Sequence, residues 1–161
     1  MELKTVKMDR ENAQEILKWK YEPPYDFYNN DLNEEELEEL LDGSYYAIKN
    51  VVSELLGFYC MGKNAQVPKG QDFGVYIEKC MDMGLGMDPK LTGKGDGTRF
   101  GIFVLNEIEG KAGGLPIRLT VADFNKRAIH LYEKLGFVAK ERFSTEAVGF
   151  ITMVKDLELM N

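Results

Sequence analysis

Apolar and polar residues follow one another along the chain in two patterns, one typical of helices and one typical of strands. In residues 10–20 the apolar side chains recur every three or four positions, which favours a helix. Short apolar or alternating runs bounded by turn-forming residues favour strands. The expected strands are residues 2–6, 45–49, 55–61, 76–87, 116–122, 137–143 and 148–155. The expected helices are residues 10–20, 98–110 and 126–135 and the stretch between Asn33 and Gly43, while residues 21–30 and 63–72 are expected to be loops.

Local signals mark the ends of these helices. Asn33 is expected to cap the acidic run E-E-E-L-E-E-L-L, whose first-turn carboxylates favour the positive end of the helix dipole. Gly43 stops that helix, and Gly136 is expected to close the helix 126–135 as a left-handed cap. The helix at 98–109 is apolar over most of its circumference, so it is expected to pack on the sheet. Strands first, then strand–loop–helix–strand–helix and a closing hairpin, predict a mixed α/β sheet.

Length and composition describe one ordinary globular domain. The chain has 161 residues, of which 44% are apolar and 29% charged. It contains no repeat, and its two longer loops are too short to be domain linkers. We therefore expect a single domain over residues 1–161.

Charge and cysteine usage exclude several functions. The net charge is −7 without a cluster of Lys and Arg, which argues against a nucleic-acid partner and is compatible with a small cationic or amine substrate. No apolar run approaches the roughly 18 residues of a membrane span, and the first residues are charged, so we expect a cytoplasmic protein without a membrane partner. Cys60 and Cys80 lie in apolar segments without a C-x-x-C pair or clustered histidines, so we expect buried free thiols and no metal.

A glycine-rich loop, P-K-L-T-G-K-G-D-G-T at residues 89–98, precedes the apolar helix. Its three alternating glycines let a ligand approach the backbone, and a helix beginning at Thr98 would add free N–H groups and a positive end, which suit an anion. The spacing does not match the Walker pattern, and G-x-G-x-G past the middle of the chain does not match the dinucleotide fingerprint. For the loop alone, a flexible turn without a ligand remains an equal alternative.

A second motif makes the loop more specific. The stretch L-T-V-A-D-F-N-K-R-A-I-H-L-Y-E-K-L-G-F at 119–137, taken with the glycine loop, strongly resembles the GNAT superfamily of N-acetyltransferases. The family pattern has Gln or Arg, then G-x-G-x-G/A, and later N-x-x-A-x-x-x-Y-x-x-x-G-F, which is matched here by Asn125, Ala128, Tyr132, Gly136 and Phe137. The resemblance covers residues 45–155 and, through the two leading helices, extends to the whole chain. It implies a mixed, mostly antiparallel sheet with a central splayed strand pair, flanked by about four helices.

The resemblance also implies acetyl-CoA, or a near relative, as co-substrate. Its pyrophosphate would lie on the amides of residues 93–98, and its pantetheine arm between the splayed strands 79–87 and 116–122. A bulge at Gly84 and Gly86 would open that gap and free an N–H near Leu85 or Gly86 for the thioester oxygen. Thr92 stands where the family usually has Gln or Arg, which is expected to weaken a supporting contact, and Asp96 is expected to point outward. The implied cofactor-binding residues are Leu85, Gly86, Met87, Thr92, Gly93, Lys94, Gly95, Asp96, Gly97, Thr98 and Asn125.

The reaction needs a neutral amine and stabilisation of the departing thiolate. Deprotonating a lysine-like amine at pH 7 costs about 4.6 kcal/mol, and an α-amine only about 1 kcal/mol. Asp82 stands where many family members carry a carboxylate base, with Glu78 as the substitute, although Asp82 also fits a solvent-facing or structurally bonded aspartate.

Tyr132 matches the family's general acid, but it also lies on an apolar helix face and fits a core aromatic. Asn125 is expected to cap the helix and to touch the cofactor arm as well. His130 lies two positions from Tyr132 and therefore faces another side of the helix, where a surface or packing role is expected.

The segment W-K-Y-E-P-P-Y-D-F-Y-N-N at 19–30 is too broken by proline to be a helix. In the family this region commonly forms one wall of the acceptor site, and Glu22, Tyr25 and Tyr28 would suit a cation there. Equally, these rings fit a loop that merely packs onto the sheet.

Together these features predict an N-acetyltransferase that uses acetyl-CoA to acetylate a primary amine of a small molecule or a protein amino terminus. The alternatives are a non-catalytic acyl-CoA-binding sensor of the same fold and a nucleotide-binding domain of another class. The acceptor, the base, the length of the acyl group and the oligomeric state stay open, although homodimers are common among relatives.

Overall fold

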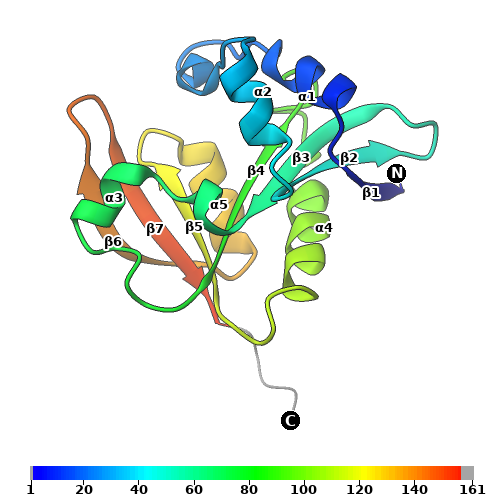
Figure 1. Ribbon diagram of the computed structural model, residues 1–161. Coiled ribbons are helices and arrows are strands. Elements are labelled where there is room, and N and C mark those ends of the chain that lie inside the picture. The colour runs from blue at the N-terminus through cyan, green and yellow to red at the C-terminus, as the bar shows by residue number, and fades with distance from the viewer. Residues whose placement is uncertain (1, 157–161) are drawn as a thin grey trace. The chain divides into compact units, whose positions relative to one another are not determined.

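The computed structural model describes residues 2–156, which form a mixed α/β fold (Figure 1). Within these residues seven strands form one sheet in the order β1-β2-β3-β4-β5-β7-β6. Where the register is defined, β4 and β5 pair in parallel, and β1–β2, β2–β3, β5–β7 and β6–β7 pair antiparallel. This confirms the predicted mixed, mostly antiparallel sheet. The strands are β1 Leu3–Lys7, β2 Tyr45–Asn50, β3 Leu55–Met61, β4 Met81–Met87, β5 Ile117–Ala122, β6 Val138–Ser144 and β7 Gly149–Lys155.

Five α-helices and two short 3-10 helices accompany the strands in the described part of the chain. The helices are α1 Arg10–Leu17, η1 Tyr25–Tyr28, α2 Glu34–Leu40, η2 Gly62–Ala65, α3 Pro68–Asp72, α4 Gly97–Glu109 and α5 Lys126–Lys134. None of the helices among residues 2–156 is long and apolar enough to cross a membrane.

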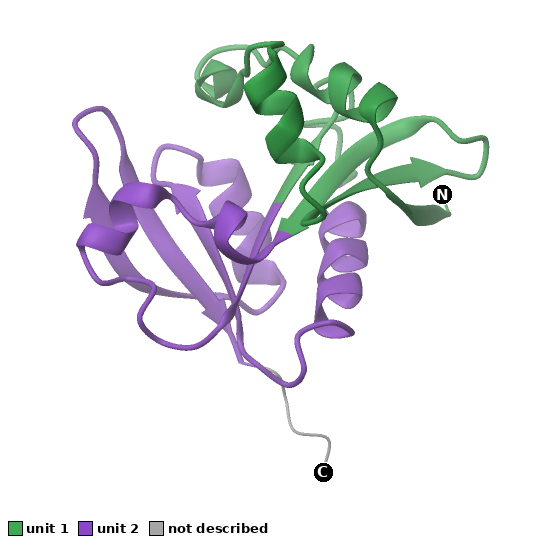
Figure 2. Ribbon diagram, viewed as in Figure 1, with its two compact units in different colours: residues 1–60, 85–96 green, residues 61–84, 97–161 purple. Residues whose placement is uncertain are grey.

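The chain divides into two compact units, coloured separately in Figure 2. Unit 1 comprises Met1–Cys60 and Leu85–Asp96, and unit 2 comprises Met61–Gly84 and Gly97–Asn161. Strand β4 passes from unit 2 into unit 1 between Gly84 and Leu85. The single domain expected from the sequence stays a prediction.

Unit 1 joins the β1–β2–β3 ladder to α1 and α2. Helix α1 begins after Asp9, whose carboxylate accepts the Asn12 N–H at 2.8 Å, and it buries an apolar face that includes Ala13 and Ile16. It ends at Leu17 rather than continuing to residue 20, with a tightened last turn in which the N–H groups of Lys18 and Trp19 bond three residues back, to the carbonyls of Glu15 and Ile16, at 3.1 Å each. At α2 the Asn33 side chain accepts the Glu36 N–H at 2.9 Å, which confirms the predicted N-cap.

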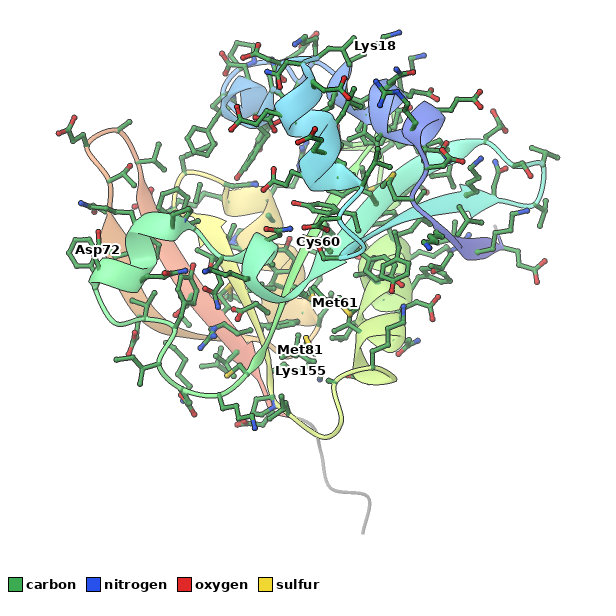
Figure 3. The ribbon with its side chains drawn as sticks, viewed as in Figure 1. Lys18, Cys60, Met61, Asp72, Met81 and Lys155 are labelled. Atoms are coloured by element: carbon green, nitrogen blue, oxygen red, sulfur yellow. The ribbon has the colours of Figure 1, made fainter. Side chains whose placement is uncertain are left out.

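Unit 2 contains the first half of β4, the strands β5, β7 and β6, and the helices α3, α4 and α5. Ile117 of β5 pairs with Met81 of β4 on one side and with Lys155, the last residue of β7, on the other. Met81 and Lys155 are labelled in Figure 3. Helix α5 ends as predicted, because Gly136 has φ +100° and the N–H groups of Gly136 and Phe137 bond back to the carbonyls of Glu133 and Tyr132 at 3.1 and 3.0 Å.

Helix α4 buries one face only, although it was predicted to be apolar over most of its circumference. Phe100, Val104 and Ile108 are buried, whereas Ile102 on the opposite side is 46% exposed. Gly101 belongs to the buried face, where an added Cβ would come within 2.9 Å of Leu135 on the α5 side of the unit. The missing side chain therefore lets α4 and α5 approach closely.

Three further predictions about local structure were wrong. The strand expected at 76–87 begins only at Met81, and the loop expected at 63–72 contains η2 and α3, the latter with Pro68 at its start. The segment Tyr25–Tyr28 is a short 3-10 helix that follows Pro24, although the prolines argued against any helix there. Proline is excluded from helix interiors but is compatible with the position just before a helix.

Candidate functional site

The glycine loop up to Asp96 lies in unit 1, and hydrogen bonds hold its first half in place. The Asp88 N–H donates to Leu56 of β3 at 2.9 Å, and Asp88 in turn accepts the N–H groups of Lys90 and Leu91 at 2.9 and 2.8 Å. The Thr92 hydroxyl donates to the Pro89 carbonyl at 2.9 Å. Thr92 therefore supports the fold of the loop with its hydroxyl proton.

The second half of the loop exposes its main chain. Gly93 and Gly95 have φ values of +74° and +85°, in the left-handed region that favours glycine, and Gly93, Lys94 and Gly95 are all exposed. A Cβ built on Gly95 meets no atom within 4 Å, so backbone conformation rather than crowding requires glycine there. An anion could reach the backbone at these positions without passing a side chain.

The chain continues from this loop directly into α4, the first element of unit 2 after the loop. The helix begins at Gly97, one residue before the predicted start at Thr98. Its first turn contains no acidic residue, so no carboxylate there opposes an anion at the positive end of the helix dipole. Asp96, the last residue of the loop, is partly exposed.

Gly86 of β4 has a packing role that the sequence did not predict. A Cβ at this position would come within 2.6 Å of the Phe58 ring atom Cζ, and still closer to Cε1 of the same ring. Phe58 lies beside Trp19 and Tyr45, with ring centroids 6.2 Å apart in both cases. The close approach of a ring in unit 1 thus gives a packing reason for glycine at position 86, and the bulge expected at Gly84 and Gly86 stays a prediction.

Tyr21 contacts the end of β4 and was missed as a site residue. Its hydroxyl donates to the Met87 carbonyl at 2.7 Å, and its backbone N–H donates to the Asn29 side chain at 2.7 Å. Burial, together with the Asp88 charge, raises the pKa of the Tyr21 phenol. The same segment that was predicted to line an acceptor site is therefore attached to the strand predicted to hold the thioester.

The predicted acceptor residues surround this attachment in unit 1. The Tyr28 ring lies edge-on to Tyr21, with centroids 6.5 Å apart, and edge-on to Phe27 at 5.3 Å. Tyr25 and Tyr28 are half-buried, whereas Glu22 is exposed. The rings thus pack on one another and still present part of their surface to solvent together with an acidic side chain.

Asp82 lies in unit 2 and is engaged by three donors. Arg118 holds it in a two-pronged ion pair, with Nε 2.7 Å from Oδ1 and Nη2 2.8 Å from Oδ2, and the Gln66 amide donates to Oδ2 at 2.9 Å. Both charged side chains are 4% exposed, and hydrogen bonding to Asp82 raises the pKa of the Arg118 guanidinium. A carboxylate held in this way fits the structural alternative better than a base. Glu78, the substitute base, has an exposed side chain, and its carbonyl accepts from Arg118 Nη1 at 2.9 Å.

Helix α5 carries the remaining candidates in unit 2. The Asn125 side chain accepts the Ala128 N–H at 3.1 Å, which confirms its role as N-cap, while its contact with a cofactor stays a prediction. Tyr132 is buried two turns later, 9% exposed, with its ring 6.0 Å from that of Phe137. His130 is exposed, as expected.

The predicted site residues fall into two groups. Unit 1 contains Leu85–Met87, Thr92–Asp96 and the segment 21–30, and unit 2 contains Asp82, Gly97, Thr98, Asn125 and Tyr132. Cys60 is buried and Cys80 half-buried, both as free thiols. Within residues 2–156 no group of three or more His, Cys, Asp or Glu is placed to hold a metal ion.

Residues 10–137 match the model of the acetyltransferase (GNAT) family. A comparison with curated protein sequences finds no match. Among solved structures, the chain is similar to a spermidine N-acetyltransferase SpeG chimera from Vibrio cholerae and hSSAT, with 21% identity, a TM-score of 0.67 and coverage of 95% of this chain and 94% of that chain. It is also similar to yncA from Salmonella typhimurium, solved with its cofactor acetyl-CoA, with 12% identity, a TM-score of 0.66 and coverage of 97% and 94%. At these identities the structures show a shared fold.

Proposed function

Because the chain belongs to the acetyltransferase (GNAT) family, we propose that it transfers an acetyl group from acetyl-CoA to a primary amine of a small molecule or a peptide amino terminus. The observation that carries the proposal is the loop at Gly93–Gly95, whose exposed left-handed backbone leads into α4. Family membership supports acetyl transfer in general, and a primary amine as the acceptor is proposed in addition.

The residues present fit a coenzyme with a pyrophosphate. The backbone of Gly93, Lys94 and Gly95 in unit 1 would hold it. The fit rests on exposed main chain and on two glycines at positive φ. Leu85, Gly86 and Met87 would line the pantetheine arm, and acetyl-CoA would supply the thioester that an amine attacks.

We expect the acceptor to be a small cationic amine. Unit 1 presents half-buried tyrosine rings beside exposed acids in the segment 21–30, an arrangement that attracts a cation through ring faces and charge. The net charge of −7 favours the approach of such a substrate. A spermidine N-acetyltransferase among the structural neighbours supports the same class of acceptor.

Tyr132 is the proposed partner of the departing thiolate. A phenol with a pKa near 10 that gave its proton to a thiol near 8.5 would do so uphill by about 2 kcal/mol. Hydrogen bonding to the thiolate, followed by proton transfer, is therefore the better description. Because three donors occupy the Asp82 carboxylate, we assign no proton abstraction to it.

The test is a thiol-release assay with acetyl-CoA and a panel of amines, including polyamines, amino acids and peptides with free amino termini. We expect amine-dependent release that is fastest with cationic amines. Tyr132→Phe should lower kcat by about 10²–10⁴-fold, the range of general acid–base catalysis, with little change in acetyl-CoA affinity. Acetyl-CoA binding without thiol release for any amine would refute the enzyme and support a sensor of the same fold.

A further inference from the structure

A connection that contains two short helices joins β3 to β4. Strand β3 ends at Met61 and β4 begins at Met81, and the intervening residues 62–80 contain η2 and α3. This connection belongs to unit 2, as do the first residues of β4 and the whole of β5. Its polar side chains converge on those two strands.

Two sets of hydrogen bonds attach the connection to β4 and β5. Gln66 donates to Asp82 at 2.9 Å, and Arg118 donates to the Glu78 carbonyl at 2.9 Å. The Tyr76 hydroxyl accepts the Val67 N–H at 2.9 Å and lies 2.7 Å from the Thr120 hydroxyl.

The side chains of the two strands that take part share one face. Arg118 and Thr120 are two residues apart on β5, so they project from the same side of the sheet. The Arg118 guanidinium also lies over the Tyr76 ring, 4.9 Å from its centroid. Asp82 and Arg118 are therefore the buried, charged centre of a cluster whose other members, Gln66, Tyr76 and Thr120, are half-buried.

The position of this cluster along the sheet is specific. Asp82 and Arg118 occupy directly paired positions of β4 and β5, next to the pair Met81–Ile117. Among the described residues of unit 2, Met83 and Gly84 follow on β4 without a paired position on β5. The ion pair thus stands at the last point where the two strands are joined within this unit.

A buried ion pair is a poor source of net stability, since desolvation offsets most of its attraction, but its geometry is demanding. A guanidinium binds a carboxylate through a planar fork, so it specifies one relative placement of the two backbones. Apolar side chains of similar volume would fill the space without specifying that placement.

We propose that Asp82 and Arg118 are positioning residues that set where β4 separates from β5. They thereby place the residues of β4 that follow in unit 2, Met83 and Gly84, from which the strand continues to the residues proposed to hold the thioester. The inference deepens the proposed function and rests on it for its kinetic consequences. It assigns Asp82 the placement of the strand and not the removal of a proton.

Two conservative variants test the proposal. Arg118→Lys keeps the charge but loses the planar fork, and Asp82→Asn keeps the shape but loses the charge. The control is Asp72→Asn, which lies in the same connection but pairs with Lys69 at the surface, 3.6 Å apart with exposed side chains. Circular dichroism and urea unfolding show which variants remain folded at the assay temperature.

The measurements are amide hydrogen exchange of the peptide containing residues 81–87 and the pH profile of kcat for amine acetylation. We expect both variants to speed exchange in that peptide at least tenfold and to lower kcat by about 10–100-fold, the cost of slight misplacement, with an unchanged pH profile. The double variant should be no slower than the slower single variant, because both disrupt one unit. Asp72→Asn should behave as the unmodified protein.

Other outcomes overturn the proposal. If Asp82→Asn alone abolishes the acid limb of the pH profile while Arg118→Lys acts normally, Asp82 is the base. If neither variant alters hydrogen exchange or kcat, the ion pair does not determine the placement of β4. If the unmodified protein acetylates no amine, the proposed function fails, and hydrogen exchange alone decides whether the pair holds β4.

Discussion

Replacing Gly86 by alanine tests whether this glycine of β4 is required by the Phe58 ring. The new methyl group would come within 2.6 Å of the ring atom Cζ and 3.3 Å of Cδ1, with Cε1 nearest of all. Favourable contacts between carbon atoms lie at about 3.5–4.0 Å. The ring or the strand must therefore move by roughly 1 Å to relieve the overlap, by subtraction of these distances.

The Phe58 ring is half-buried, and two neighbouring rings limit its freedom to move. Trp19 and Tyr45, which flank Phe58 with centroids 6.2 Å away, are themselves only 9% and 8% exposed. Overpacking in such surroundings costs about 1–3 kcal/mol. We expect Gly86→Ala to lower the free energy of unfolding by an amount in that range.

Urea unfolding, followed by tryptophan fluorescence, measures this change, since Trp19 is the one tryptophan of the chain. The suppressor is Phe58→Leu, whose smaller side chain leaves room for the methyl group. The double variant should be more stable than the sum of the two single changes predicts, with a coupling of about 1 kcal/mol or more. Gly110→Ala is the control, because a Cβ there meets only ordinary contacts of 3.6 Å and beyond.

A packing role of Gly86 is refuted if Gly86→Ala is as stable as Gly110→Ala, or if the effects of Gly86→Ala and Phe58→Leu are additive. Either result would mean that the ring yields without cost. If Gly86→Ala loses acetyl-CoA affinity without losing stability, Gly86 contacts the coenzyme and is not required for packing.

Two further predictions concern the N-cap residue Asn125 and the charge of Glu39. Asn125→Ala and Asn33→Ala each remove an N-cap hydrogen bond, and each should lower the free energy of unfolding in urea by about 1 kcal/mol. Only Asn125→Ala should also weaken acetyl-CoA binding in a thermal-shift titration. Equal binding by both variants would mean that Asn125 does not belong to the coenzyme site. Burial and the nearby carboxylates, Glu36 foremost, raise the pKa of Glu39. The folded protein then binds more protons than the unfolded chain between the two pKa values, so stability falls as pH rises through that window. Glu39→Gln should accordingly unfold at higher urea concentration at pH 7, with a gain that shrinks towards about pH 4.3, and no gain at pH 7 would contradict this sign.

Features encoded within a few residues were predicted well. The caps at Asn33 and Asn125 and the stop at Gly136 each depend on one side chain or one backbone angle within a single helical turn. Strand β3 begins and ends at the predicted residues for a related reason, since its apolar run is bounded by turn residues on both sides. The family motifs likewise lie in two short stretches, so they could be recognised without knowing the fold.

Contacts between distant residues were not predicted. The ion pair of Asp82 and Arg118 joins positions 36 apart in sequence, and the hydrogen bond from Tyr21 to Met87 joins positions 66 apart. One signal was present, because Asp82 and Arg118 are charges of opposite sign that interrupt apolar runs, M-D-M and I-R-L, in strands expected to be neighbours. Buried charges of this kind need a partner. The sequence therefore contained the pair, although no local pattern showed that it would also attach residues 62–80.

These two missed contacts and the packing of Phe58 against Gly86 all involve β4. This strand reads M-D-M-G-L-G-M, and its two glycines leave it few side chains with which to hold its own place. Other elements supply what it lacks: Arg118 holds Asp82 in unit 2, while in unit 1 the Phe58 ring fills the space beside Gly86 and the Tyr21 hydroxyl binds the carbonyl of Met87. A strand whose own side chains are sparse offers its backbone to a ligand, and it stays ordered because its neighbours provide the packing.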